Sequence, residues 1–184
     1  MDSKKYKIIY ADPPWNYKDK SKSHGGGAES HYNCMSLKAI CSLNVRELSD
    51  TNSVLLMWAT MPMLEEAFRV INAWVFKYKT CAFTWVKINK DGSIYMGMGR
   101  HTRANAEICL LATRGKGVSR LTASIKNTHL HKKTKHSEKP VLFKNLIQQL
   151  YGYHLPKIEL FARQKTEGWD VWGNEVESDI KLGA

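Results

Sequence analysis

The tetrapeptide Asp12–Trp15 (D-P-P-W) combines the residue types in this sequence that are best suited to chemistry. Asp12 supplies acceptor oxygens, and the Pro13-Pro14 unit stiffens the backbone and presents a carbonyl without a competing amide donor. Trp15 supplies a flat apolar face. An exocyclic amine on a planar ring could donate to both acceptors and stack on the indole. The four residues therefore predict a catalytic site for such an amine, although an Asp-Pro turn beside a core tryptophan would give the same pattern.

Two segments lack hydrophobic periodicity and are expected to lie near the catalytic site. Residues 16–34 combine lysines, histidines and a glycine triplet, which predicts an active-site loop directly after the first strand. Residues 113–139 contain eight Lys or Arg residues and one acid, Glu138, and are expected to form a basic loop. Loops of this length in a compact domain are usually functional or disordered. We expect both loops at the sheet edge where α/β proteins bind their ligands.

Strand-like and helical segments alternate along the chain, which predicts an α/β sheet that positions these loops. A chain of 184 residues favours a single domain over residues 1–184. The apolar run at 53–59 is typical of a strand buried on both faces, and Gly152 is expected to end the last helix. The expected strands are 6–11, 53–59, 79–87, 106–112 and 157–162, and the expected helices are 62–74 and 140–151.

Composition narrows the class of protein further. The hydrophobic share of 43% is too high for a disordered basic tail, and the net charge of +11 points to nucleic acid as a partner. No apolar stretch approaches the roughly 18 residues that a membrane-spanning helix needs, so we expect a cytoplasmic protein. The four cysteines are widely spaced and form no C-x-x-C pair, so neither a metal site nor a disulfide framework is expected.

The D-P-P-W tetrapeptide resembles the fourth motif of amino-group methyltransferases, and in this form it resembles the MT-A70 family of adenine-N6 methyltransferases. Further matches follow in the family's order over residues 6–175. They are His31-Tyr32 with Met35-Ser36, Leu56–Thr60, Trp85–Lys87, Gly97-x-Gly99 with Arg103 and Glu107, Arg114–Lys116, His136–Pro140, Lys157–Arg163, Gly168-Trp169 and Gly173–Glu175.

The resemblance implies a Rossmann-like methyltransferase fold, with a mixed, mostly parallel sheet flanked by helices, and S-adenosylmethionine as the cofactor. It implies that Lys139 pairs with the cofactor's carboxylate, for which an ammonium is well suited. Glu159 lies within an apolar strand, so its carboxylate needs a ligand or a paired charge. Relatives often carry Gln at the position of Glu175. The cofactor-binding residues implied are Asp12, Ser137, Lys139, Glu159, Phe161, Arg163, Asn174 and Glu175, and the catalytic residues are Asp12, Pro13, Pro14 and Trp15.

An adenine inside a duplex cannot present its amine, so the target must be flipped out or single-stranded. The lack of long extensions resembles bacterial and phage members and favours DNA over RNA. Methylation of RNA adenine or of cytosine N4, and a non-catalytic nucleic-acid-binding subunit, remain alternatives, as do a monomer and a homodimer. The residues expected to contact nucleic acid, by stacking or through phosphates, are Tyr17, Lys18, His31, Tyr32, Arg103, Arg114, Lys132, Lys133 and Lys135.

Overall fold

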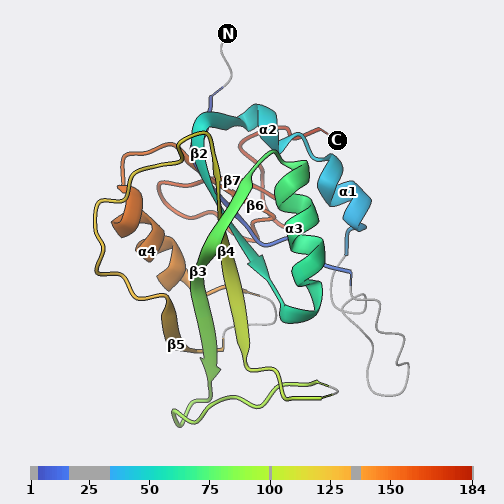
Figure 1. Cartoon of the computed structure of the whole chain (residues 1–184), viewed down its shortest axis with the longest axis vertical. Helices are drawn as coiled ribbons and strands as arrows, with labels where there is room; N and C mark the ends of the chain where they lie inside the picture. Colours follow the sequence, from blue (N-terminus) through green and yellow to red (C-terminus); the bar gives the residue numbers. More distant parts are fainter. Residues whose placement is uncertain (1–3, 17–33, 100, 134–137, 184) are drawn as a thin grey trace.

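A central β-sheet organises the chain, for which a computed structural model describes residues 4–16, 34–99, 101–133 and 138–183. The described residues form seven strands in the order β5-β3-β4-β2-β1-β6-β7 (Figure 1). The strands are β1 (Tyr6–Ala11), β2 (Ser49–Ala59), β3 (Lys77–Ile88), β4 (Ala106–Arg114), β5 (Thr128–Lys132), β6 (Lys157–Leu160) and β7 (Asp170–Trp172). The helices are α1 (Leu37–Ser42), α2 (Val45–Leu48), α3 (Leu64–Ala73) and α4 (Val141–Tyr151), with a 3-10 turn, η2 (Met61–Met63), before α3.

Strand β4 runs against both of its neighbours, β2 and β3, whereas all other paired strands of this sheet are parallel. The predicted mixed, mostly parallel sheet and Rossmann-like α/β class are therefore confirmed. Because β4 is reversed, its first residues lie beside the last residues of β2 and β3. We call this the carboxyl edge, since β1, β2, β3, β5 and β6 all end there, and the opposite one the amino edge.

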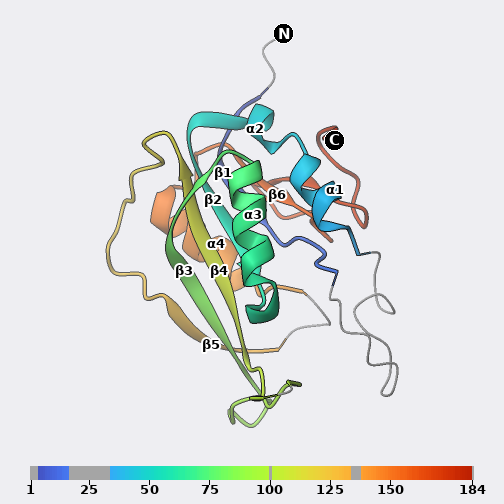
Figure 2. The same ribbon diagram turned by 45° about the vertical axis from the view of Figure 1, so that its right-hand side comes forward.

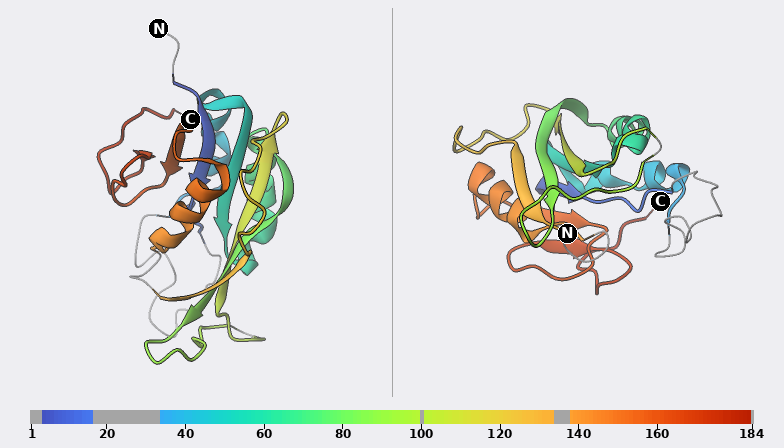
Figure 3. Two further views of the ribbon diagram at one scale, coloured as in Figure 1. Left: turned by 90° about the vertical axis from the view of Figure 1, so that its left-hand side faces the viewer. Right: turned by 90° about the horizontal axis from the view of Figure 1, so that it is seen from below.

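Helices cover both faces of the sheet (Figure 3). Successive side chains of β2 point to opposite faces, so Leu55 and Met57 pack in one core with α1 and α3. Leu56 and Trp58 pack in a second core with α4. The prediction that this strand is buried on both faces is confirmed, because residues 53–59 are all buried.

The predicted strands and helices all occur, with small shifts at their ends. Helix α3 begins at Leu64 rather than at residue 62, because Pro62 belongs to the preceding 3-10 turn. Helix α4 begins after Pro140 and ends at Gly152, whose φ of 109° lies in the region that favours glycine. None of the helices in the described ranges is long and apolar enough to cross a membrane.

The loop predicted at 113–139 is wrong in part, because it contains β5 and the last two residues of β4. Strand β5 pairs with β3 at the edge of the sheet, and its exposed residues alternate with half-buried ones. Such a strand has no apolar run to reveal it. The structure also adds α1, α2 and β7, which were not predicted. Residues 17–33 of the predicted active-site loop lie outside the described residues.

Candidate active site

The Asp12–Trp15 turn follows β1 directly and is fixed by backbone hydrogen bonds. The amide of Asp12 donates to the carbonyl of Leu160 (3.4 Å), which ties the turn to the end of β6. The amide of Trp15 donates to the carbonyl of Pro13 (2.8 Å), and Pro14 accepts from the amide of Met35 (3.1 Å). The turn therefore holds the Asp12 carboxyl at the carboxyl edge, between the ends of β2 and β6.

The Trp15 side chain faces the core rather than the site. Its exposed fraction is 5%, and its indole Nε1 donates to the carbonyl of Trp58 (3.2 Å). The expectation of an exposed indole face is corrected, because the ring is covered by the core of α1 and α3. In this structure Trp15 anchors the turn, and its assignment to catalysis stays a prediction.

Four charged side chains form an alternating row at the carboxyl edge, which we call the charge cluster. Nζ of Lys139 lies 2.7 Å from Oδ2 of Asp12 and 3.2 Å from Oε2 of Glu107. Lys87, at the end of β3, pairs with the other carboxylate oxygen of Glu107. The Lys139 side chain is 9% exposed and the Asp12 side chain 22% exposed. The cluster therefore joins residues from β1, β3, β4 and the segment before α4.

Sequence reasoning identified Lys87 and Glu107 as parts of motifs but gave neither a role in the site. Each carries a charge beside buried or half-buried residues, Lys87 near the end of β3 and Glu107 near the start of β4. That pattern predicts a partner for each charge. The reversed direction of β4, which brings the two together, is the part that the sequence does not reveal.

Burial and neighbouring charge oppose each other in the charge cluster. Burial raises the pKa of Asp12 above its ordinary value, and Lys139 offsets part of that rise. For Lys139, burial favours the neutral amine, but Asp12 and Glu107 outweigh it and raise the pKa. Burial also acts to raise the pKa of Glu107, yet Lys139 and Lys87 outweigh it and lower the pKa. Lys139 and Glu107 are therefore both charged at neutral pH.

Glu159 on β6 forms an ion pair with Lys144 of α4. Oε2 of Glu159 lies 2.5 Å from Nζ of Lys144, whose side chain is 7% exposed. The same ammonium also donates to Oγ1 of Thr166 (2.6 Å). Burial raises the pKa of Glu159, and Lys144 offsets part of that rise. Sequence reasoning missed Lys144, since a helix lysine usually remains solvated.

The ends of β6 and β7 meet in a tight junction. Phe161 has a φ of 63°, which is strained for a bulky side chain, and its ring lies edge-on to Trp172 at 5.4 Å. A Cβ at Gly173 would lie 2.2 Å from the carbonyl oxygen of Ala162, so a side chain cannot fit there. Backbone strain of this kind is concentrated at functional sites.

The remaining predicted cofactor residues lie around this junction. Nε of Arg163 is 3.7 Å from Oε1 of Glu175, and Asn174 beside it is exposed. Glu159 and Phe161 are on the same chain segment, so the structure brings these five residues together at the ends of β6 and β7. Ser137 lies outside the described residues.

The residues predicted to contact nucleic acid separate into two groups. Lys132 and Lys133 end β5 at the carboxyl edge, and Arg103 is exposed in the connection from β3 to β4. Arg114 lies at the amino edge, where its guanidinium donates to the carbonyls of Arg46 and Ser49. The expectation that the whole basic segment lies at one edge is corrected, because β4 ends opposite the Asp12 turn. Tyr17, Lys18, His31, Tyr32 and Lys135 lie outside the described residues.

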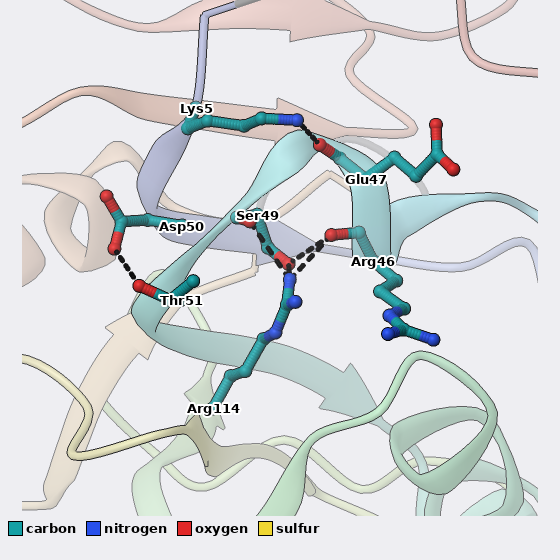
Figure 4. A pocket seen from close by; sticks show the side chains of 7 residues that line it. All are labelled: Lys5, Arg46, Glu47, Ser49, Asp50, Thr51 and Arg114. Atoms are coloured by element: carbon teal, nitrogen blue, oxygen red, sulfur yellow. Dashed lines mark hydrogen bonds between the residues drawn. The ribbon is translucent and has the colours of Figure 1, made fainter.

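A pocket of about 420 Å³ also lies at the amino edge, away from the charge cluster (Figure 4). Its lining residues are Lys5, Arg46, Glu47, Ser49, Asp50, Thr51 and Arg114. The guanidinium of Arg114 points at oxygens of α2 and β2 rather than into open space. We place the candidate site at the charge cluster, because its charges are largely buried and adjoin the Asp12 turn. Within the described part of the chain, no group of three or more His, Cys, Asp or Glu side chains could hold a metal ion.

Comparison with known proteins places these features in a family. Residues 6–175 match the family MT-A70. The type II methyltransferase M.MunI of Mycoplasma sp is 34% identical over 193 residues, covering 96% of this chain and 80% of its own. The human N(6)-adenine-specific methyltransferase METTL4 is 26% identical over 94% of this chain and 38% of its own. The N6-methyladenosine RNA methyltransferase MTA1 of Cryphonectria parasitica is 34% identical over 51% of this chain and 27% of its own.

Proposed function

Because the chain belongs to the MT-A70 family, we propose that it transfers a methyl group from S-adenosylmethionine to N6 of adenine in DNA. The observation that carries this proposal is the position of Asp12. Its partly exposed carboxylate stands at the end of a central strand, immediately before the Pro13 carbonyl and 2.7 Å from a buried ammonium. An acceptor pair of this kind suits an amine that carries two protons.

The relatives support the choice of substrate. Adenine is supported by the printed name of human METTL4, and DNA by the likeness to M.MunI, a type II methyltransferase matched over 96% of this chain. The RNA methyltransferase MTA1 matches 51% of the chain, so RNA is the second candidate.

The residues at the carboxyl edge fit the proposed cofactor. When bound, S-adenosylmethionine supplies an electrophilic methyl group on its sulfonium sulfur. Lys139 would share its ammonium between Asp12 and the cofactor's carboxylate. Glu159 is paired with Lys144, but a carboxylate has several lone pairs and could also accept from a ribose hydroxyl. Phe161, Arg163, Asn174 and Glu175 would line the same side.

Asp12 and Pro13 would position the target amine. The Pro13 carbonyl already accepts from the amide of Trp15 at 2.8 Å, but a carbonyl oxygen has two lone pairs and can accept a second hydrogen bond. Two hydrogen bonds from the amine would draw its lone pair out of conjugation with the ring and aim it. Burial raises the pKa of Asp12, which makes the carboxylate a better acceptor for the proton that the methylated amine must lose.

Basic side chains at the carboxyl edge would hold the nucleic acid. Lys132, Lys133 and Arg103 are exposed there, and phosphate contacts of this type give affinity and register without sequence information. Since a base in a duplex cannot reach Asp12, the adenine must leave the stack.

The purified protein, with methyl-labelled S-adenosylmethionine and duplex DNA, single-stranded DNA or RNA, tests the proposal directly. We expect label in N6-methyldeoxyadenosine. Label in N6-methyladenosine of RNA alone would move the substrate to RNA, and label in N4-methylcytosine would move it to the other base. Cofactor binding without transfer to any nucleic acid would overturn the enzyme assignment.

A substitution of Asp12 tests the role of that residue. Asp12→Ala should lose turnover while DNA binding, measured by fluorescence anisotropy, stays within about threefold, because no phosphate contact is removed. Asp50→Ala at the amino edge is the matched control and should keep both. Turnover retained by Asp12→Ala would refute the role given to its carboxylate.

A further inference from the structure

The connection between β3 and β4 exposes an unusual run of apolar side chains at the carboxyl edge. Residues 89–99 and 101–105, which we call the arm, extend beyond the ends of both strands (Figures 1 and 2). Ile94, Met96 and Met98 are 58%, 72% and 79% exposed, and the two methionines are the most exposed large apolar side chains of the described residues. Tyr95 and Gly97 between them are half-buried. Exposed apolar residues therefore alternate along the arm with half-buried ones.

The arm is slender because its two branches approach closely. A Cβ at Gly97 would lie 2.0 Å from the carbonyl oxygen of Ala104, and one at Gly99 would lie 2.0 Å from that of Thr102. The amide of Ala104 donates to the carbonyl of Met98 (3.2 Å). Glycine is therefore required at both positions, and the methionines flank the narrowest part of the arm.

The base of the arm is joined to the charge cluster. The amide of Tyr95 donates to the carbonyl of Lys87 (2.9 Å), and the Lys87 ammonium pairs with Glu107. Glu107 in turn contacts Lys139, which contacts Asp12. Three successive ion pairs at the carboxyl edge thus link the base of the arm to Asp12.

The surroundings of the methionines are basic. Lys90 and Arg103 are exposed on the arm itself, and Nζ of Lys133 lies 4.6 Å from the centre of the Tyr95 ring. Asp91 is the acid among the described residues of the arm, and it accepts hydrogen bonds from Ser93. This balance favours a polyanion as the occupant. A second copy of the chain, meeting the first arm to arm, would bring these cations together.

We propose that Met96 and Met98 form an apolar wedge that enters duplex DNA beside the target adenine and fills the space left when that base flips out. Apolar side chains between base steps are a known way to unstack and kink DNA. Methionine suits this position because its unbranched thioether adapts to aromatic surfaces. The wedge rests on the proposed function, since it assigns the way in which that same site obtains its base from a duplex.

The test compares Met96→Ala/Met98→Ala with the wild-type protein on linear, unmethylated plasmid DNA. At saturating protein, the double variant should transfer methyl groups at least about tenfold more slowly, because the energy for unstacking is lost. Its affinity for the same duplex should change by less than about threefold, since phosphate contacts dominate affinity. Leu121→Ala is the matched control, because Leu121 is 68% exposed and lies away from the arm, against the end of α4. It should change neither quantity.

A second variant distinguishes insertion of the side chains between bases from electrostatic attraction to DNA. Met96→Lys/Met98→Lys adds positive charge, so it should bind duplex DNA at least as tightly as the wild-type protein while losing transfer. Unchanged transfer by the alanine variant would overturn the wedge, as would an equal loss of transfer and of duplex affinity. Loss of a homodimer in the alanine variant, measured by sedimentation, would assign the methionines to a protein interface and also overturn it.

A measurement that does not depend on methyl transfer tests the wedge separately from the proposed function. A wild-type protein that transfers no methyl group to any DNA would overturn the function. The wedge would then be judged by unwinding: bound protein should change the linking number of a relaxed plasmid during topoisomerase treatment, and Met96→Ala/Met98→Ala should not. Equal unwinding by the two proteins would overturn the wedge.

Discussion

At the carboxyl edge, the ammonium of Lys139 is almost buried between the carboxylates of Asp12 and Glu107. At the amino edge, Arg114 directs its guanidinium at the backbone oxygens of Arg46 and Ser49. Both edges thus contain charged side chains. At the carboxyl edge these side chains form ion pairs with one another, whereas at the amino edge Arg114 bonds to backbone carbonyls. Buried ion pairs are weak contributors to stability, because desolvation offsets their attraction.

The contrast shows which kind of polar cluster indicates function. Arg114 ties the end of β4 to α2 and β2, so its hydrogen bonds explain its position without a ligand. The charge cluster instead holds largely buried charges against one another, and perturbed pKa values in a group of this kind are typical of functional sites. A pocket of about 420 Å³ also lies beside Arg114 at the amino edge.

The largest effect that this contrast predicts is the difference between two aspartates. Asp12→Asn should slow methyl transfer by about 100-fold to 1000-fold, the usual cost of losing a transition-state hydrogen-bond partner. Asp50→Asn, in the amino-edge pocket, should change the rate by less than about twofold because it touches no reacting group. Single-turnover rates with labelled cofactor measure both. Equal losses would break the distinction between the edges.

Lys139 and Arg114 offer the next comparison. Lys139→Met should weaken cofactor binding by about 2–5 kcal/mol, the typical cost of truncating one partner of a buried charge pair. Isothermal titration calorimetry measures it. Arg114→Met serves as the control and should leave cofactor affinity unchanged. Weakened binding in Arg114→Met would mean that the amino edge contributes to the site.

The converse holds for stability. Arg114→Met removes hydrogen bonds to three oxygens of Arg46 and Ser49, so it should lower the free energy of unfolding by about 1–3 kcal/mol. Urea denaturation followed by circular dichroism measures this loss. DNA affinity should stay unchanged. A lower salt dependence of DNA binding in this variant would show that Arg114 contacts phosphate after all.

Salt dependence should sharpen the placement of the basic residues. Lys132→Gln/Lys133→Gln should reduce the slope of log affinity against log salt by about two, or roughly one per lost phosphate contact. Fluorescence anisotropy at several salt concentrations measures the slope. Lys5→Gln at the amino-edge pocket is the control, and an equal change there would show that DNA covers both edges.

The smallest effect concerns pH. Methyl transfer needs ionised Asp12, so the rate should fall as the pH drops through its pKa, which burial raises above 3.8. Glu107 also acts to raise that pKa, whereas Lys139 lowers it. Glu107→Gln should therefore move the acid limb of the rate profile to lower pH, measured at saturating cofactor. A shift to higher pH would contradict the electrostatic account of the cluster.

Much of the fold could be predicted from the sequence, because buried strands are recognisable as apolar runs. The run at 53–59 is nearly continuously apolar, which predicts burial on both faces of the sheet. Strand β5 was not predicted because an exposed edge strand needs no apolar run. Strand β7 was not predicted because it is only three residues long. The antiparallel direction of β4 was not predicted either, because strand direction depends on the path of the connecting segment and not on composition.

The site was predictable in its residue types but not in their orientation. Asp12 and Lys139 were identified separately and prove to be in contact. Trp15 was expected to be open and is buried, because four residues specify a turn without saying which way its side chains face. Lys144 is buried beside Phe143 on α4, and the carboxylate of Glu159 within an apolar strand was the signal that such a cation must exist.

The reversal of β4 also makes the arm an exchangeable part. Because β3 and β4 are antiparallel neighbours, their pairing continues up to the carboxyl edge, and the arm joins them there without crossing the sheet. Its length and sequence can change without altering strand order or register. We therefore expect that the arm of a related protein, grafted between Lys87 and Glu107, would leave the strand order and the catalytic centre intact.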